Sequence, residues 1–180
     1  MRRIAVLSGL VLVGGVLGPS TAFAGEDGDH DHRWIAVEDE FTVVLPDGQT
    51  FTEDPGPMDP NDAPPVGTRL FISEKLYKTD DGKTRGDAVG RSHIECTAQV
   101  VEFSFLCDAA LVFDDGSQLI VSVHLDFSDP SLEGEPFDIA VTGGTNDFFG
   151  ATGQITATDI STSDTETVSR YDADLVLPHK

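Results

Sequence analysis

Residues 137–160 read FDIAVTGGTNDFFGATGQITATDI, and their pattern sets the fold class. Apolar residues alternate with polar or small ones at the start, and Ile155, Ala157 and Ile160 mark a second run. Each run predicts a half-buried β-strand. Four glycines between the runs are typical of backbone with positive φ or of close approach between chain segments. Because no helical pattern follows and the Lys-Ser/Thr pair of a phosphate loop is missing, the stretch predicts a β-hairpin and not a nucleotide site.

The same alternation recurs through the rest of the chain. It predicts six further strands, at 34–45, 69–78, 87–101, 103–113, 119–127 and 167–177. Asp-Gly turns at 79–83 and 114–117 close hairpins between them, whereas residues 46–66 are too rich in proline for a regular element. Eight antiparallel strands can close into a barrel, which removes exposed edges. The fold class is therefore all-β, and the pattern alone leaves a sandwich and a lipocalin-type barrel open.

Two carboxyl groups interrupt apolar stripes. Asp39 lies among Ile35, Val37, Phe41 and Val43 on the first strand, and Glu74 shares a face with Leu70, Ile72 and Leu76 on the second. A buried, unpaired charge costs much free energy, so both acids are candidates for a functional site. A β-bulge that turns Asp39 outward is the alternative.

The two cysteines, Cys96 and Cys107, fall on the inward faces of neighbouring strands. In an exported protein this arrangement favours a disulfide, with a free Cys96 in the cavity as the alternative. The inward face offers no nearby histidine for a Cys–His nucleophile pair. The inward positions of the third strand are small, which leaves space inside a barrel, and Phe148 and Phe149 of the glycine-rich loop are expected to enter the core.

The first 24 residues have the form of a signal peptide. Two arginines precede an apolar run at 4–17, and Ala22-Phe23-Ala24 is a small-residue cleavage site. A retained membrane anchor is the alternative. We therefore expect three regions: a signal peptide (1–24), an acidic, histidine-containing polar tail (25–33) and a barrel domain (34–180). The tail could collect a metal loosely, but a solvated segment is the preferred reading and no metal site is predicted.

The chain is strongly acidic, with a formal net charge of −21 over 180 residues, and −23 once Arg2 and Arg3 leave with the signal peptide. Nucleic acid and anionic membrane surfaces would repel such a chain. The sequence thus predicts an extracellular protein without a nucleic-acid partner and, after processing, without a membrane partner. A homo-oligomer stays open.

Two segments resemble a known family. AVTGGTNDFFGATGQIT, from Ala140, is similar to the glycine-rich hairpin of allene oxide cyclases and dirigent-like barrels, with Asn146 where the family usually has glycine. FISEKLYKTDDGK, from Phe71, is similar to the family's second-strand motif. The resemblance spans about 66–178 and implies an eight-stranded antiparallel barrel around an apolar cavity. It also implies that Glu74 stands where the family places a cavity-facing Asn or Asp. The family's first-strand carboxylate aligns with Glu38, although strand alternation favours Asp39.

Members of this family steer cyclisation or coupling of apolar molecules without a cofactor. The resemblance therefore implies a cavity for an apolar small molecule, no cofactor, and Glu74, Asp39 and Glu38 as catalytic candidates. The expected cavity-lining residues are Ile72, Cys96, Leu111, Val121, Val123, Phe148 and Tyr171. Two functions remain open: a cofactor-free cyclase or isomerase, and a non-catalytic exported protein that binds a ligand or serves the envelope or a stress response. The leader favours the second.

Overall fold

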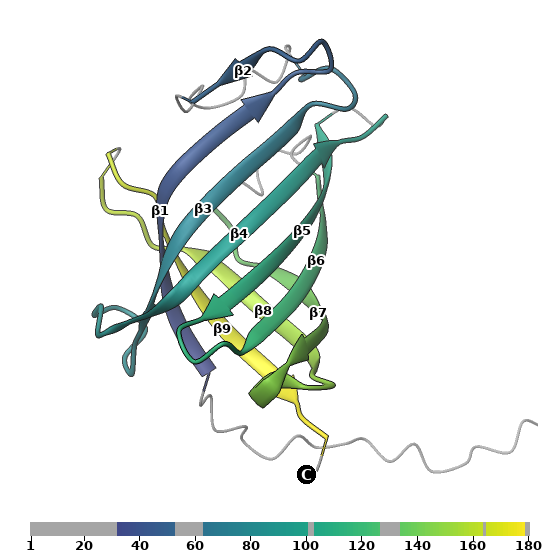
Figure 1. Ribbon diagram of the computed structural model, residues 1–180. Coiled ribbons are helices and arrows are strands. Elements are labelled where there is room, and N and C mark those ends of the chain that lie inside the picture. The colour runs from purple at the N-terminus through teal and green to yellow at the C-terminus, as the bar shows by residue number, and fades with distance from the viewer. Residues whose placement is uncertain (1–31, 53–62, 101–102, 127–133, 164, 179–180) are drawn as a thin grey trace, which may run out of the picture.

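The computed structural model describes residues 32–52, 63–100, 103–126, 134–163 and 165–178. They form nine strands and one short 3-10 helix, η2 (Figure 1): β1 (His32–Val44), β2 (Thr50–Phe51), β3 (Arg69–Lys78), β4 (Ala88–Ala98), β5 (Ser104–Phe113), β6 (Gln118–Asp126), β7 (Phe137–Thr145), η2 (Asn146–Phe148), β8 (Thr152–Asp159) and β9 (Val168–Val176). Neighbours from β3 to β9 pair antiparallel, and β1 pairs with both β3 and β9. The predicted all-β, eight-stranded closed antiparallel barrel is therefore confirmed.

One short element was not expected. Residues 46–66 were predicted to hold no regular structure, yet Thr50 and Phe51 form β2, which pairs with Val44 and Val43 at the end of β1. The turn at Gly48, with φ of 87°, brings the chain back onto β1. Residues 53–62, which make up much of this proline-rich loop, lie outside the described residues.

The glycine-rich hairpin forms as predicted, and its special backbone positions explain its composition. Asn146 has φ of 53°, the left-handed region that asparagine tolerates better than most residues. At Gly153, with φ of 126°, an added Cβ would lie 2.1 Å from the carbonyl oxygen of Asp174 on β9. Glycine therefore lets β8 approach β9 closely. Of the two loop aromatics, Phe148 is buried and Phe149 is 73% exposed, so the expectation that both enter the core is wrong for Phe149.

The strand faces of β1 change at a β-bulge. Its register against β3 shifts between Glu38 and Glu40, which leaves Asp39 as an extra residue. Before the bulge, Ala36 and Glu38 pair with the inward residues Leu76 and Glu74; after it, Phe41 pairs with inward Ile72. The apolar residues of β1 that seemed to share one face therefore lie on two faces: Ile35 and Val37, before the bulge, point outward, and Phe41, after it, points inward.

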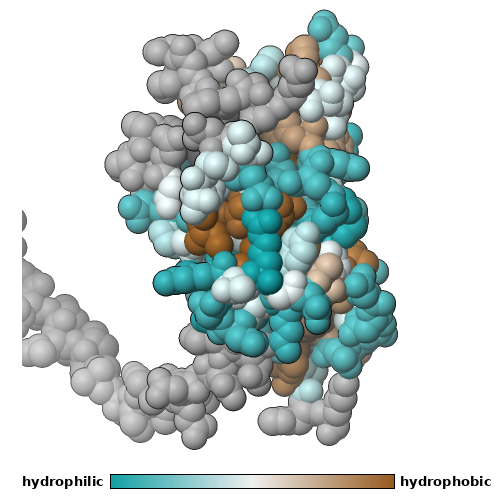
Figure 2. Space-filling view, turned by 90° about the vertical axis from the view of Figure 1, so that its left-hand side faces the viewer, coloured by the Kyte–Doolittle hydropathy of each residue, from teal (hydrophilic) through white to brown (hydrophobic). Residues whose placement is uncertain are grey.

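The outward-facing apolar residues before the bulge are also buried. Ile35 and Val37 pack with Val168 of β9 on the outside of the barrel, and Tyr77 and Ile160 pack against them. Next to this cluster, Arg85 binds Glu166 through two hydrogen bonds of 2.7 and 3.1 Å and lies over the ring of Tyr77. On the side of the barrel that carries β1, Figure 2 shows apolar surface at the centre, bordered by hydrophilic side chains, and further apolar surface toward the upper end.

The barrel interior is filled at one end and hollow toward the other. At the end near the C-terminus, the rings of Trp34, Phe113 and Phe148 pack together, with ring centroids 5.2 Å apart for Trp34 and Phe113 and 5.1 Å for Phe113 and Phe148. Phe148, expected to line the cavity, instead belongs to this aromatic plug because η2 folds it over the barrel end. The plug leaves the middle and the opposite end of the barrel for a cavity.

The start of the chain lies outside the described residues, and so does the signal peptide that the sequence predicts. Of the expected polar tail, residues 25–31 also lie outside, whereas His32 and Arg33 begin β1 and pair with β9. Arg33 forms an ion pair with Asp172, its register partner on β9, which ties the first residues of β1 to β9. No helix within the described ranges is long and apolar enough to cross a membrane.

Candidate functional site

A cavity of about 200 Å³ opens inside the barrel beyond the aromatic plug. Six of the seven residues expected to line it do so: Ile72, Cys96, Leu111, Val121, Val123 and Tyr171. Phe137, Ile139 and Ile155 of the glycine-rich hairpin complete much of the apolar wall. Alternation explains this set, because each of these residues faces the barrel axis on its own strand.

Glu74 is the polar centre of this cavity. The residue is only 5% exposed, and its carboxyl group accepts hydrogen bonds from two hydroxyl groups. Tyr171 Oη of β9 donates to Oε2 at 2.8 Å and lies 3.1 Å from Oε1, and Ser92 Oγ of β4 donates to Oε2. Three strands thus hold one carboxyl group inside an otherwise apolar space.

Burial dominates the electrostatics of this group. Burial raises the pKa of Glu74, because a charged carboxylate loses its hydration in the cavity. The negative charge of Asp39 raises it further, to a smaller extent. The hydrogen bonds from Ser92 and Tyr171 oppose the shift without cancelling it. Burial, and then the nearby Glu74, raise the pKa of Tyr171 as well, so its hydroxyl stays a proton donor.

The other two acids expected at the site lie on opposite sides of the wall. Glu38 of β1 lies opposite Glu74 of β3 in the strand register and lines the cavity. Asp39 turns outward and binds Arg91 at 2.8 and 2.9 Å and Lys75 at 3.4 Å. The preference for Asp39 over Glu38 as the cavity-facing acid is therefore wrong, because the bulge breaks the alternation on which it rested.

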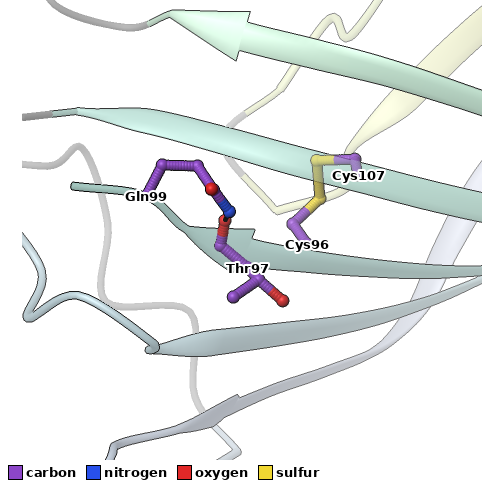
Figure 3. Close-up of a disulfide and its surroundings, with 4 residues drawn as sticks. All are labelled: Cys96, Thr97, Gln99 and Cys107. Atoms are coloured by element: carbon purple, nitrogen blue, oxygen red, sulfur yellow. Dashed lines mark hydrogen bonds between the residues drawn. A yellow bond between two sulfur atoms is a disulfide. The ribbon is translucent and has the colours of Figure 1, made fainter. Parts of the chain in front are cut away.

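The cysteines form the predicted disulfide, which also lies in the cavity wall. Cys96 of β4 and Cys107 of β5 are direct cross-strand partners, and their side chains are 5% and 3% exposed (Figure 3). Both border the cavity. The alternative of a free Cys96 is thereby excluded, and the disulfide contributes a rigid apolar surface to the site.

Ser92 is the site residue that the sequence analysis missed. Its inward position follows from alternation with Gly90 and Ile94 on β4, and its register partner is Glu74. The signal was present, because the residue across from a buried carboxyl group is its nearest source of a donor. What alternation alone did not provide was the register that places Ser92 opposite Glu74.

A larger and more open hollow, of about 570 Å³, lies at the plugged end beside His32, Trp34 and Phe148. Lys78 and Asp147, which border this hollow, are exposed, whereas Glu74 is buried. We therefore take the inner cavity as the candidate site. Within the described residues there is no cluster of three His, Cys, Asp or Glu side chains suited to hold a metal ion.

Comparison with known proteins places the barrel among solved structures. No protein-family model matches the sequence, and no curated protein matches it either. Two solved structures superpose with a TM-score of 0.54: a pyocyanin demethylase (20% identity, 81% of this chain and 98% of that one) and the pterocarpan synthase dirigent protein GePTS1 (18% identity, 79% and 85%). The chain has the fold of the dirigent-type barrels. A second pterocarpan synthase dirigent protein, PsPTS1, gives a TM-score of 0.51 at 18% identity, over 83% of this chain and 98% of its own.

The fold that the resemblance implied is thus confirmed for this dirigent-type barrel. Identities of 18–20% carry the architecture and not the activity. What the site can do must follow from its own residues, above all from Glu74, Tyr171 and Ser92.

Proposed function

We propose that the protein is an exported barrel that binds an apolar small molecule in its cavity and steers a cofactor-free cyclisation or isomerisation there. One observation carries this proposal. Glu74 is buried in an apolar cavity and is held by two hydroxyl groups, not by a cation. A carboxyl group in that setting costs stability, and such costs are typical of residues kept for function.

The chemistry available to Glu74 is proton transfer. Because its pKa is raised, Glu74 holds its proton to higher pH than an exposed carboxyl group does, and in the protonated form it can protonate one atom of a bound molecule and then take a proton from another. Such a relay changes connectivity or tautomeric state without an oxidant or reductant. Tyr171 and Ser92 are positioned to stabilise the carboxylate formed in between, and the dry apolar wall restricts the conformers of the molecule.

The similar structures support a reaction on a small molecule. Two of them bear names of such reactions, pterocarpan synthesis and pyocyanin demethylation. The cavity of about 200 Å³ is smaller than most ligand sites, which are commonly about 300–1,000 Å³. It suits a compact molecule with one or two rings.

The second candidate is a non-catalytic exported binding, envelope or stress protein, and the predicted leader favours it. The disulfide fits an oxidising destination outside the cell. Under this reading, Glu74 orients a ligand by hydrogen bonding and no bond changes.

An isomer screen separates the two candidates. Mature protein is incubated with small molecules extracted from the producing culture, and the extract is analysed by chromatography and mass spectrometry. A cyclase or isomerase converts one compound into another of equal mass; the Glu74→Gln variant does not, whereas Glu40→Gln, the same change on the outer face of β1, still does. A binding protein retains a compound unchanged with all three chains. If no compound is retained or converted, the proposed function is wrong.

A further inference from the structure

The charged groups around the cavity all have one sign. The ionisable residues among its described lining are Glu38, Glu74, Asp108 and Tyr171, and no lysine, arginine or histidine belongs to that lining. The two basic side chains next to this part of the wall, Lys75 of β3 and Arg91 of β4, point the other way, since both bind Asp39 on the outer surface. The described part of the cavity wall therefore offers no positive charge that would neutralise an anionic ligand.

None of the described residues gives Glu74 a counter-charge. Its described hydrogen-bond partners, Tyr171 and Ser92, are uncharged hydroxyl groups. Uncharged donors only partly offset the loss of hydration of a carboxylate in an apolar space. A positively charged group on the ligand would supply the missing charge, and its hydrogen bond to Glu74 would be stronger than one between neutral groups.

The field of the whole chain acts in the same direction. A net charge of −21 attracts cations toward the barrel and repels anions. Salt screens this long-range contribution over about 8–10 Å, whereas a direct ion pair inside the cavity is screened much less. The two contributions can therefore be separated by experiment.

We propose that the cavity selects a small apolar molecule with one protonated nitrogen, over neutral and anionic molecules of the same size. The ammonium group binds the carboxylate of Glu74, and the apolar part lies against Val121 and Val123. This inference rests on the proposed function, in that it names the class of molecule that the same cavity takes.

Three probes of matched shape test the selection: benzylamine, benzyl alcohol and benzoate. Each is titrated into the mature protein at about pH 8 and high salt, and binding is followed by NMR through the methyl groups of Val121 and Val123. Benzylamine should bind about tenfold more tightly than benzyl alcohol, because a charged hydrogen bond replaces a neutral one, and benzoate should bind weakest. Glu74→Gln should remove the preference for benzylamine, and Glu40→Gln should keep it.

The pH dependence of the wild-type protein is a second readout that needs no variant. Benzylamine preference should grow as pH rises through the folded-state pKa of Glu74, while binding of benzyl alcohol stays level. The groups facing Glu74 are Tyr171, Ser92 and Glu38, with Asp39 behind the wall, and none of them provides a positive charge.

The outcomes distinguish a failure of the selection from a failure of binding altogether. If benzyl alcohol binds as tightly as benzylamine, or if Glu74→Gln retains the preference, the selection is wrong and the binding cavity stands. If benzoate binds tightest, the selection is likewise wrong. If none of the three probes shifts the cavity methyl groups, the selection and the proposed binding function both fail.

Discussion

Glu74 has the only carboxyl group that is buried within the described part of the chain, and its cost to the fold depends on pH. Because burial raises its folded-state pKa, the unfolded chain releases this proton at lower pH than the folded chain does. Below the unfolded value, about 4.3, the group is protonated in both states and the shift costs no stability. As pH rises from there to the folded pKa, stability is progressively lost.

Glu74→Gln should therefore stabilise the barrel, and the gain should depend on pH. We expect little difference in Tm at about pH 4, a growing advantage of the variant above that value, and a plateau beyond the folded pKa. Thermal unfolding between about pH 4 and 8 measures it, with Glu40→Gln as control. A gain that does not change with pH would show that the Glu74 carboxyl group is not desolvated.

Tyr171→Phe removes one of the two described donors to Glu74 and keeps the ring. We expect a loss of about 1–3 kcal/mol in the free energy of unfolding at neutral pH, since a buried carboxyl group loses a partner. The folded pKa of Glu74 should rise further, and the loss should shrink toward acidic pH, where Glu74 is neutral in both states. Urea unfolding at two pH values checks this. An equal loss at both would mean that the hydroxyl contributes packing only.

At the level of single elements, the bulge in β1 decides which acid the cavity receives. Deleting Asp39 removes the extra residue and leaves Glu38 opposite Glu74 and Glu40 opposite Ser73, so the pairing becomes continuous and both halves of β1 keep their inward faces. We expect the deletion variant to fold with Glu38 still facing the cavity, and Asp39→Asn to change stability by about 1 kcal/mol or less, because the ion pairs of Asp39 with Arg91 and Lys75 are on the surface. Circular dichroism and thermal unfolding measure both variants. An unfolded deletion variant would show that the bulge itself is needed to close the barrel.

The disulfide connects β4 and β5 across the cavity wall. Replacing Cys96 and Cys107 by alanine removes a link over a sequence separation of 11 residues, and we expect a loss of about 2–3 kcal/mol for a loop of this size. Urea unfolding of the double variant measures the loss. A free energy of unfolding equal to that of the oxidised protein would mean that strand pairing alone fixes this hairpin.

For the whole molecule, the leader predicts export and cleavage after Ala24. Chain recovered from the culture medium should begin at Gly25, which N-terminal sequencing determines. A chain that still begins at Met1 in the membrane fraction would support the retained anchor instead.

Local patterns predicted much of this molecule, and long-range register accounts for what they missed. Alternation identified every strand of the barrel and placed Glu74, Ile72 and Tyr171 correctly around the axis. It failed at Asp39, where one extra residue reverses the faces, because a bulge leaves no local signature in the alternation of β1. It also failed at Phe148, whose position depends on η2 folding over the barrel end.

The closure of β1 on β9 has a consequence for the order of folding. This seam joins residues 32–37 to 168–173, nearly the full length of the barrel domain, and we expect contacts so distant in sequence to form slowly and after the hairpin pairings. On this expectation, Tyr171 reaches Glu74 only when β9 pairs with β1. Until it pairs, the Glu74 carboxylate can remain hydrated at an open sheet, so the step that seals the barrel is also the step that takes this charge out of water. Folding should therefore be faster in acid than at neutral pH, where sealing must first remove the charge.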